Sequence, residues 1–301
     1  VKELLLQGVI GRVLSVHFEW LLDTRHGADY FRRWHRDKLN SGGLLVHKST
    51  HHFDLVNWWL DSRPESVFAS GGLKFYGREN AEARGVTRFY DRGTGNPRAA
   101  ADPFALDLAA DPNLKGLYLD AEHEDGYRRD TSVFSDGISI EDDVAVVVNY
   151  EGGAVMSYHL TAYSPWEGCR VAFNGTKGRL EYEVVESSYV SGSAGDPNRP
   201  DIRDGAQIDI REEAVITIRP HWEKPTRIVV AKKGEGGHGG ADKLLLRDLF
   251  VGDGQDSLGL RADHRCGVYS IITGIAANRS LEEKRLVRVG DLLREVGRQT
   301  V

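Results

Sequence analysis

The sequence predicts an α+β fold, in which an open, mainly antiparallel β-sheet carries helices on one face. Two groups of segments, at 143–186 and 207–233, alternate apolar and polar residues, and the short turns between them favour antiparallel hairpins. Four other segments repeat apolar residues at helical spacing, at 44–60, 241–251, 260–278 and 290–298. No internal repeat or low-complexity linker divides these elements, so we expect residues 1–301 to form a single domain.

Local signals predict each element in chain order. The first half holds a helix end closed by Gly8, a half-buried strand over 9–22, a helix over 44–60 introduced by Gly42-Gly43, and a strand over 65–76. The second half holds the strands DVAVVVNY, AVMSYHLTAY and RLEYEVVE, then QIDIRE, AVITIRP and RIVVAKK, before the last three helices. Because Val1 is not an initiator methionine, we expect the natural protein to continue upstream.

Residues 77–137 interrupt this pattern. They are rich in Gly, Pro, Asp and Arg and show little periodicity, and a long excursion of this kind inside a compact domain is usually functional or disordered. We interpret it as a substrate-side loop. Its polar residues His123, Glu124, Tyr127 and Arg128 are candidates to close over a binding pocket.

Composition narrows the function classes. Lys and Arg number 39 against 45 Asp and Glu, a formal charge of −6 that disfavours a general nucleic-acid binder and favours a small-molecule partner. No run of about twenty apolar residues predicts a membrane span. Cys169 and Cys266 lack metal-ligand spacing and are too few for a disulfide framework, so we expect core residues in a reducing, cytoplasmic setting.

A glycine-rich run at 234–239, GEGGHG, satisfies the G-x-G-x-x-G spacing of dinucleotide-binding loops. That motif requires a second parallel strand after its helix and an acidic residue about twenty positions on. The chain continues instead into GDGQD and another helix. We therefore interpret the run as a turn before a helix, and we assign no cofactor-binding residue to this chain.

The most informative segment is the helix of 44–60. His47, His51 and Asp54 follow the spacing i, i+4 and i+7, so they share one face, whereas His52 is rotated by about a hundred degrees. Two imidazoles beside a carboxylate suit general acid or base catalysis. One alternative is structural: these polar side chains only form hydrogen bonds with one another between the helix and the sheet. A zinc site that adds His238 is another, although the H-E-x-x-H motif is absent and we predict no metal.

A basic and aromatic loop, residues 23–38, precedes this helix. Its polar and aromatic side chains suit the hydroxyls, carboxylate or phosphate of a sugar-like substrate. A solvated loop is the alternative, and nucleic-acid binding is less favoured on an acidic chain. The candidate substrate-binding residues here are Arg25, His26, Tyr30, Arg33 and Trp34, with Asp54 and His238 from elsewhere.

The glycine pair followed by the histidine helix resembles the Gfo/Idh/MocA family of oxidoreductases. Gly42, Gly43, His51 and Asp54 fall on that family's pattern, and His51 matches its catalytic histidine. Position 47 departs from the pattern, since His47 stands where the family commonly has Asp. The family's catalytic lysine belongs to a Glu-Lys-Pro motif in its coenzyme domain, so Lys48 is not its counterpart. The resemblance extends over nearly the whole chain, through the segments Val9–Trp20, GHGGAD, ITGIAANRS and VRVGDLL.

The resemblance implies a substrate-binding and oligomerisation domain whose upstream Rossmann domain, which carries NAD or NADP, lies outside this chain. It implies hydride transfer to or from a sugar or polyol, with His51 exchanging the proton and His47 or Lys48 assisting. We expect the isolated chain to be inactive and to form a homodimer or homotetramer through an apolar open face of the sheet. Alternatives are an NAD-dependent glycoside hydrolase and a noncatalytic sugar-binding or assembly module.

Overall fold

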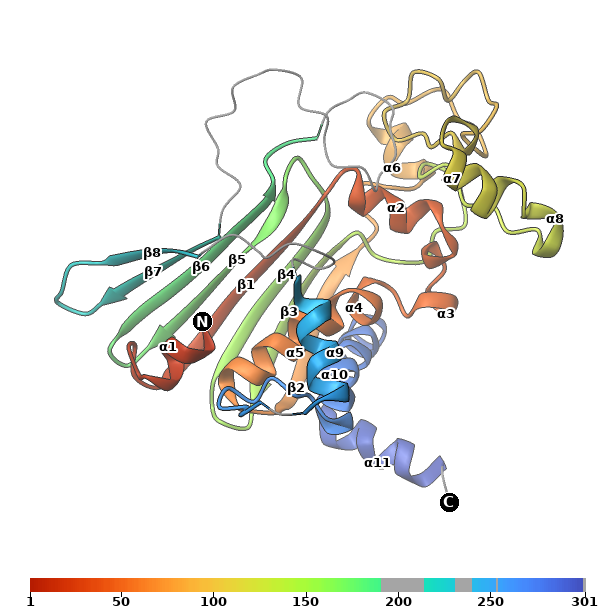
Figure 1. Ribbon diagram of the computed structural model, residues 1–301. Helices are drawn as coiled ribbons and strands as arrows, with labels where there is room; N and C mark the ends of the chain where they lie inside the picture. Colours follow the sequence, from red (N-terminus) through yellow and green to blue (C-terminus); the bar gives the residue numbers. More distant parts are fainter. Residues whose placement is uncertain (191–213, 231–239, 253, 300–301) are drawn as a thin grey trace.

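The computed structural model describes residues 1–190, 214–230, 240–252 and 254–299. Its centre is a nine-stranded sheet in the order β8-β7-β6-β5-β1-β4-β3-β2-β9 (Figure 1). Neighbouring strands run antiparallel except β1 and β4, which are parallel. The strands are β1 (Val13–Asp23), β2 (Pro64–Gly72), β3 (Asp143–Tyr150), β4 (Val155–Ser164), β5 (Glu167–Gly175), β6 (Gly178–Ser187), β7 (Ala214–Pro220), β8 (Thr226–Val230) and β9 (Val287–Arg288).

The predicted open, mainly antiparallel sheet is confirmed, but one central strand was not predicted. Strand β5 lies between β1 and β6, and seven of its nine residues are buried. Its buried Cys169, Val171 and Phe173 alternate with Arg170 and Ala172, which line the open face, but this alternating run is short and lies between Gly168 and Gly175. The predicted strand QIDIRE lies outside the described residues.

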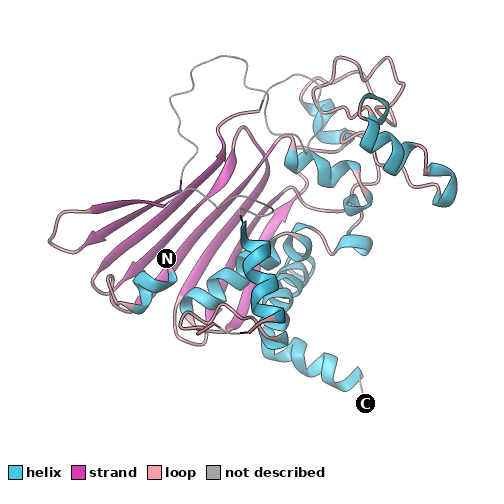
Figure 2. Ribbon diagram, viewed as in Figure 1, coloured by secondary structure: helices cyan, strands magenta, loops and turns pink. Residues whose placement is uncertain are grey.

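Helices cover one face of the sheet (Figure 2). They are α1 (Lys2–Leu6), α4 (Leu44–His47), α5 (Ser49–Leu60), α10 (His264–Glu283) and α11 (Val289–Gln299), while α9 (Ala241–Phe250) has no buried residue. Gly274 lets α10 pack closely on α4, because a Cβ there would lie 2.2 Å from the Leu45 carbonyl oxygen. No described helix is long and apolar enough to cross a membrane. Cys169 is buried as expected, but Cys266, at the exposed start of α10, is not a core residue.

The helix predicted over 44–60 is divided at Lys48, which separates α4 from α5. The hydroxyl of Thr50 donates a hydrogen bond to the Val46 carbonyl, four residues earlier. Hydroxyls that bond back in this way often bend helices. The break places Lys48 at a corner between two helical segments.

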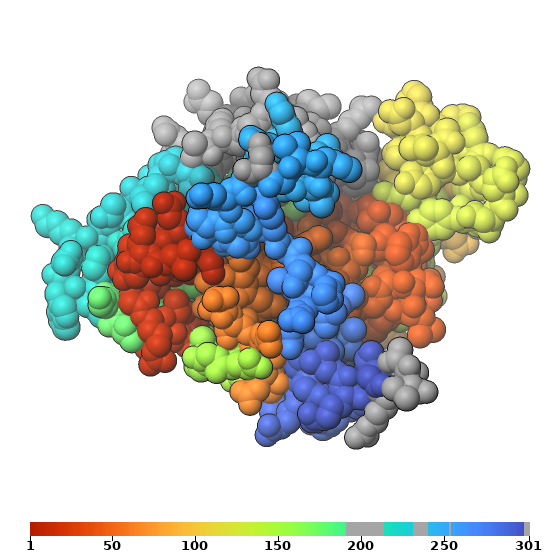
Figure 3. Space-filling view, turned by 60° about the horizontal axis from the view of Figure 1, so that its bottom comes forward, coloured from red at the N-terminus to blue at the C-terminus, as the bar shows by residue number. Residues whose placement is uncertain are grey.

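Residues 77–137 form a folded lobe at the end of the sheet that holds the C-terminus of β1 (Figures 1 and 3). The lobe contains α6 (Arg78–Ala83), η2 (Leu108–Ala110), α7 (Pro112–Leu114), η3 (Lys115–Leu119) and α8 (Glu122–Asp125). Leu106, Leu108 and Leu114 give it a small core of its own. It packs beside α2 (His26–Arg32), η1 (Trp34–Arg36) and α3 (Lys38–Ser41). The excursion is therefore built of short helices and turns.

Candidate functional site

Lys48 lies at the centre of the candidate site. Its Nζ is 5.2 Å from the centre of the Trp20 ring, on β1. Burial lowers the pKa of Lys48, while the carboxylates of Glu167 and Glu186 act in the opposite direction. A lysine in this setting exchanges a proton more readily than an exposed one.

His47 packs in a cluster of rings beside Lys48. Its ring centre is 4.2 Å from that of His35 and 5.5 Å from that of Tyr30, and Trp34 stacks on His35 at 3.8 Å. Burial lowers the pKa of His47, and the charges of Arg33, Lys48 and His51 lower it further. Burial and the Arg33 charge lower the pKa of His35 to about 3. Both imidazoles are therefore neutral near neutral pH.

Glu167, the first residue of β5, is a site residue that the sequence did not reveal. Its Oε1 lies 2.7 Å from Nδ1 of His26, and Nε2 of His26 lies 3.4 Å from the hydroxyl of Tyr30. Glu167 was missed because its strand was missed. The Gly168 that follows it has φ +159, an extended conformation, and gave no turn signal.

Two contacts fix helix α2, which carries His26 and Tyr30. Asp23 Oδ1 accepts hydrogen bonds from the backbone N–H groups of Arg25 and His26, at 2.9 and 2.8 Å. Gly27 allows α2 to lie directly on β4, since a Cβ there would be 1.9 Å from the Ala162 carbonyl oxygen. The position of His26 is thus set by the sheet.

His51 and His52 have different surroundings, as the helical phase predicted. His51 is exposed, whereas His52 is 3% exposed, stacks on Trp20 at 4.3 Å and lies 2.7 Å from the Tyr158 hydroxyl through its Nδ1. Burial lowers the pKa of His52 well below its usual value. His52 is a core residue, and His51 is the histidine of this pair that faces solvent.

Asp54 lies apart from Lys48 and the rings around His47. It lines a hollow of about 850 Å³ together with Trp58 and the loop at 257–259. Burial raises the pKa of Asp54, and the His51 charge opposes that rise. His238 lies outside the described residues.

Two of the four arginines of the basic loop hold the lobe in place. Arg32 donates to the Phe104 carbonyl at 3.0 Å, and Arg36 donates to the Asp136 carbonyl at 2.7 Å. Arg33 pairs with Asp29 at 2.9 Å but remains partly exposed over the Tyr30 ring. Trp34 is 44% exposed and is the accessible aromatic side chain of the loop.

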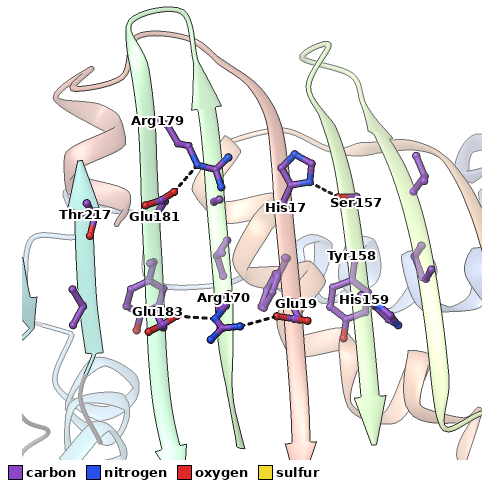
Figure 4. Close-up of a pocket in the computed structure, with 18 of the residues that line it drawn as sticks. His17, Glu19, Ser157, Tyr158, His159, Arg170, Arg179, Glu181, Glu183 and Thr217 are labelled. Atoms are coloured by element: carbon purple, nitrogen blue, oxygen red, sulfur yellow. Dashed lines mark hydrogen bonds and ion pairs between the residues drawn. The ribbon is translucent and has the colours of Figure 1, made fainter. Parts of the chain in front are cut away.

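The open face of the sheet forms a second hollow of about 970 Å³, away from Lys48 (Figure 4). Charged side chains cross it in pairs: Arg170 lies 2.7 Å from Glu183 and 3.8 Å from Glu19. Exposed apolar residues such as Phe68 and Val147 lie toward the β2 side. The open face therefore combines paired charges with exposed apolar side chains, as a surface that joins two copies of a chain can.

Among the described residues β1 and β4 are the parallel pair, and the glycine-rich run at 234–239 lies outside the described residues. Across the described part of the chain no group of three or more His, Cys, Asp or Glu could hold a metal ion.

Comparison with known proteins assigns the chain to a protein family. The chain matches the model of the oxidoreductase family C-terminal alpha/beta domain over residues 2–289. It therefore belongs to the Gfo/Idh/MocA family of oxidoreductases.

Among individual proteins, the chain is similar to the Bacillus subtilis (strain 168) protein named oxidoreductase YteT, with 39% identity over 97% of this chain and 66% of the relative. A solved structure of aldose-aldose oxidoreductase from Caulobacter crescentus, complexed with glycerol, matches 95% of this chain and 58% of its own, with a TM-score of 0.54 and 12% identity. Levoglucosan dehydrogenase in complex with NADH matches 96% and 61%, with a TM-score of 0.53 and 15% identity. At such identities, the two structures establish the fold alone. The chain thus spans about two thirds or less of each of these proteins.

Proposed function

We propose that this chain is the substrate-binding and oligomerisation domain of a longer enzyme that moves a hydride between NAD or NADP and a hydroxyl-bearing carbon of a sugar or polyol. Two structural relatives support this proposal, since one is a levoglucosan dehydrogenase with NADH and the other an aldose-aldose oxidoreductase with glycerol. The coenzyme supplies the hydride acceptor or donor and is held mainly outside this chain. The residues of this chain orient the substrate and exchange its proton.

One observation carries the proposal most directly: His47, which has a lowered pKa, adjoins the exposed Trp34, and the next residue, Lys48, also has a lowered pKa and lies over Trp20. An aromatic face beside acid or base groups suits a sugar ring, whose apolar side stacks while its hydroxyls form hydrogen bonds. We assign proton exchange to His51, with His47 or Lys48 assisting. Arg25, His26, Tyr30, Arg33 and Trp34 remain the proposed substrate contacts, whereas Asp54 lines a separate hollow and is not placed with them.

The direct test expresses the full-length protein and supplies sugars and polyols with NAD or NADP. Formation of reduced coenzyme with at least one of them is the expected result. Cleavage of a glycoside without net reduced coenzyme would instead establish a hydrolase. Binding without turnover of either kind would establish a noncatalytic module. The chain of 301 residues alone should be inactive and bind NAD no more tightly than millimolar, which calorimetric titration measures.

We also propose that the open face joins copies of the chain as a homodimer or homotetramer. Its paired charges, such as Arg179 with Glu181 at 2.8 Å, could exchange partners across a twofold axis, as isologous interfaces allow. Light scattering over a range of concentrations tests this, and a monomer at the highest concentration contradicts it. We place the protein in the cytoplasm, since both cysteines are free.

A further inference from the structure

Three side chains from two elements form a chain of hydrogen bonds beside the candidate site. Tyr30 and His26 lie one turn apart on α2, with the hydroxyl 3.4 Å from Nε2, and Glu167 on β5 lies 2.7 Å from Nδ1. An ionised carboxylate can only accept a hydrogen bond. Nδ1 of His26 must therefore carry the hydrogen, and in the neutral ring Nε2 is left as an acceptor.

The direction of each bond then follows. Because Nε2 accepts, the Tyr30 hydroxyl donates to it, and the lone pairs of the Tyr30 oxygen remain available. Burial raises the pKa of Tyr30 to about 12, so this hydroxyl keeps its proton near neutral pH. The Tyr30 oxygen can thus accept one more hydrogen bond from a neighbouring donor.

Neighbouring groups hold the hydrogen-bonded side chains of Tyr30, His26 and Glu167 in place. Tyr30 is 5% exposed and Glu167 is 6% exposed, and Glu167 Oε2 also accepts from the backbone N–H of Asp23 at 3.4 Å. The ring of Tyr30 lies against His47, on the side of the candidate site. Lys48 acts electrostatically on Glu167, and Arg33 acts on Tyr30.

We propose that Glu167 is a positioning residue that fixes the tautomer of His26 and thereby leaves the Tyr30 oxygen to accept a hydrogen bond from a substrate hydroxyl. The inference rests on the proposed function and adds a specificity to it. A polyol with a free hydroxyl at this point donates a hydrogen bond to the Tyr30 oxygen. An O-methyl or deoxy analogue leaves the lone pairs of that buried oxygen without a donor.

The tautomer can be measured on the full-length protein without any ligand. Long-range proton–nitrogen correlation with labelled histidine, assigned with His26→Gln, should show His26 with its hydrogen on Nδ1. In the Glu167→Ala variant, the hydrogen of the His26 ring should move toward Nε2. The matched control, Glu183→Gln, removes an exposed carboxylate that pairs with Arg170 and should leave the spectrum of His26 unchanged. A hydrogen on Nε2 in the unaltered chain, or no response to Glu167→Ala, overturns the proposal.

A second measurement uses the full-length enzyme, comparing each sugar or polyol it oxidises with the corresponding mono-O-methyl derivatives. Tyr30→Phe should reduce the preference for the free hydroxyl at one position by about tenfold, the upper range for one neutral hydrogen bond. An unchanged preference overturns the role of Tyr30 in reading the substrate. Absence of any turnover contradicts the proposed function alone, because the tautomer measurement still decides the role of Glu167.

Discussion

The ion pairs of Asp29 and Asp130 with arginines, which we call the lobe anchor, and the site around Lys48 both contain ionisable side chains, but they use them differently. In the anchor, Asp29 lies 2.6 Å from Arg129 and 2.9 Å from Arg33, and Arg92 lies 2.9 Å from Asp130. Around Lys48, burial instead lowers the pKa of both Lys48 and His47. Paired charges hold two parts of the fold together, while groups with shifted pKa values keep their capacity for proton exchange.

The largest expected effect comes from breaking the anchor. Asp29→Asn removes the carboxylate that faces Arg129 and Arg32, both about 2–3% exposed, and leaves two guanidinium groups buried without it. We expect the free energy of unfolding to fall by roughly 3–5 kcal/mol, measured by urea denaturation. Asp136→Asn is the control, since its side chain is 77% exposed and its loss should change stability little. Equal effects of the two variants would contradict the assigned difference.

A substitution in the site should change turnover with little change in stability. In the full-length enzyme, His51→Ala should lower turnover by at least about a hundredfold, the lower range for a positioned acid or base. His52→Ala removes one of two partners of the buried Tyr158 hydroxyl, the other being Ser49, and leaves a cavity beside Trp20, so it should act mainly on stability. Steady-state kinetics on folded variants separates the two. Near-normal turnover of His51→Ala, or its loss in His52→Ala alone, would show that the proton acceptor is misassigned.

A smaller effect should appear in the dependence of stability on pH. The pKa of His35 falls from 6.5 to about 3 in the folded chain, so between these values the unfolded state binds more protons. Stability from His35 is therefore fully present above pH 6.5 and declines as the pH falls toward 3. His35→Phe should flatten this decline in urea midpoints, whereas His159→Phe, on the open face, should not. Parallel curves for all three proteins would exclude His35 as a cause.

The sequence predicted features that depend on periodicity. The sheet, most helices and the opposite surroundings of His51 and His52 all follow from side chains repeating with the period of their element. Glu167 was not predicted, because it stands before Gly168 at the start of β5, outside the short alternating run from Cys169 to Phe173, and no local pattern marks it.

Hydrogen bonds between distant segments explain the other differences between the predicted and the observed roles of these residues. The basic loop was interpreted as a set of substrate contacts, yet Arg32 and Arg36 donate to lobe carbonyls some 70 and 100 residues away. A count of arginines cannot separate those that hold the fold from those that remain partly accessible, such as Arg33. Contacts between distant segments decide this, and a single sequence does not contain them.

The parallel pairing of β1 and β4 has a consequence for how the protein is made. His17 and Ser157 are hydrogen-bonded neighbours in these strands, yet they stand 140 residues apart. During synthesis β1 emerges early, and its two partner strands follow only after the whole lobe has been translated. Long-range strand pairing of this kind slows folding and leaves apolar strand edges open in the meantime. His26 and Glu167 also meet only when β5 has joined β1, so a nascent chain that ends before β5 carries the histidine helix but not its completed site.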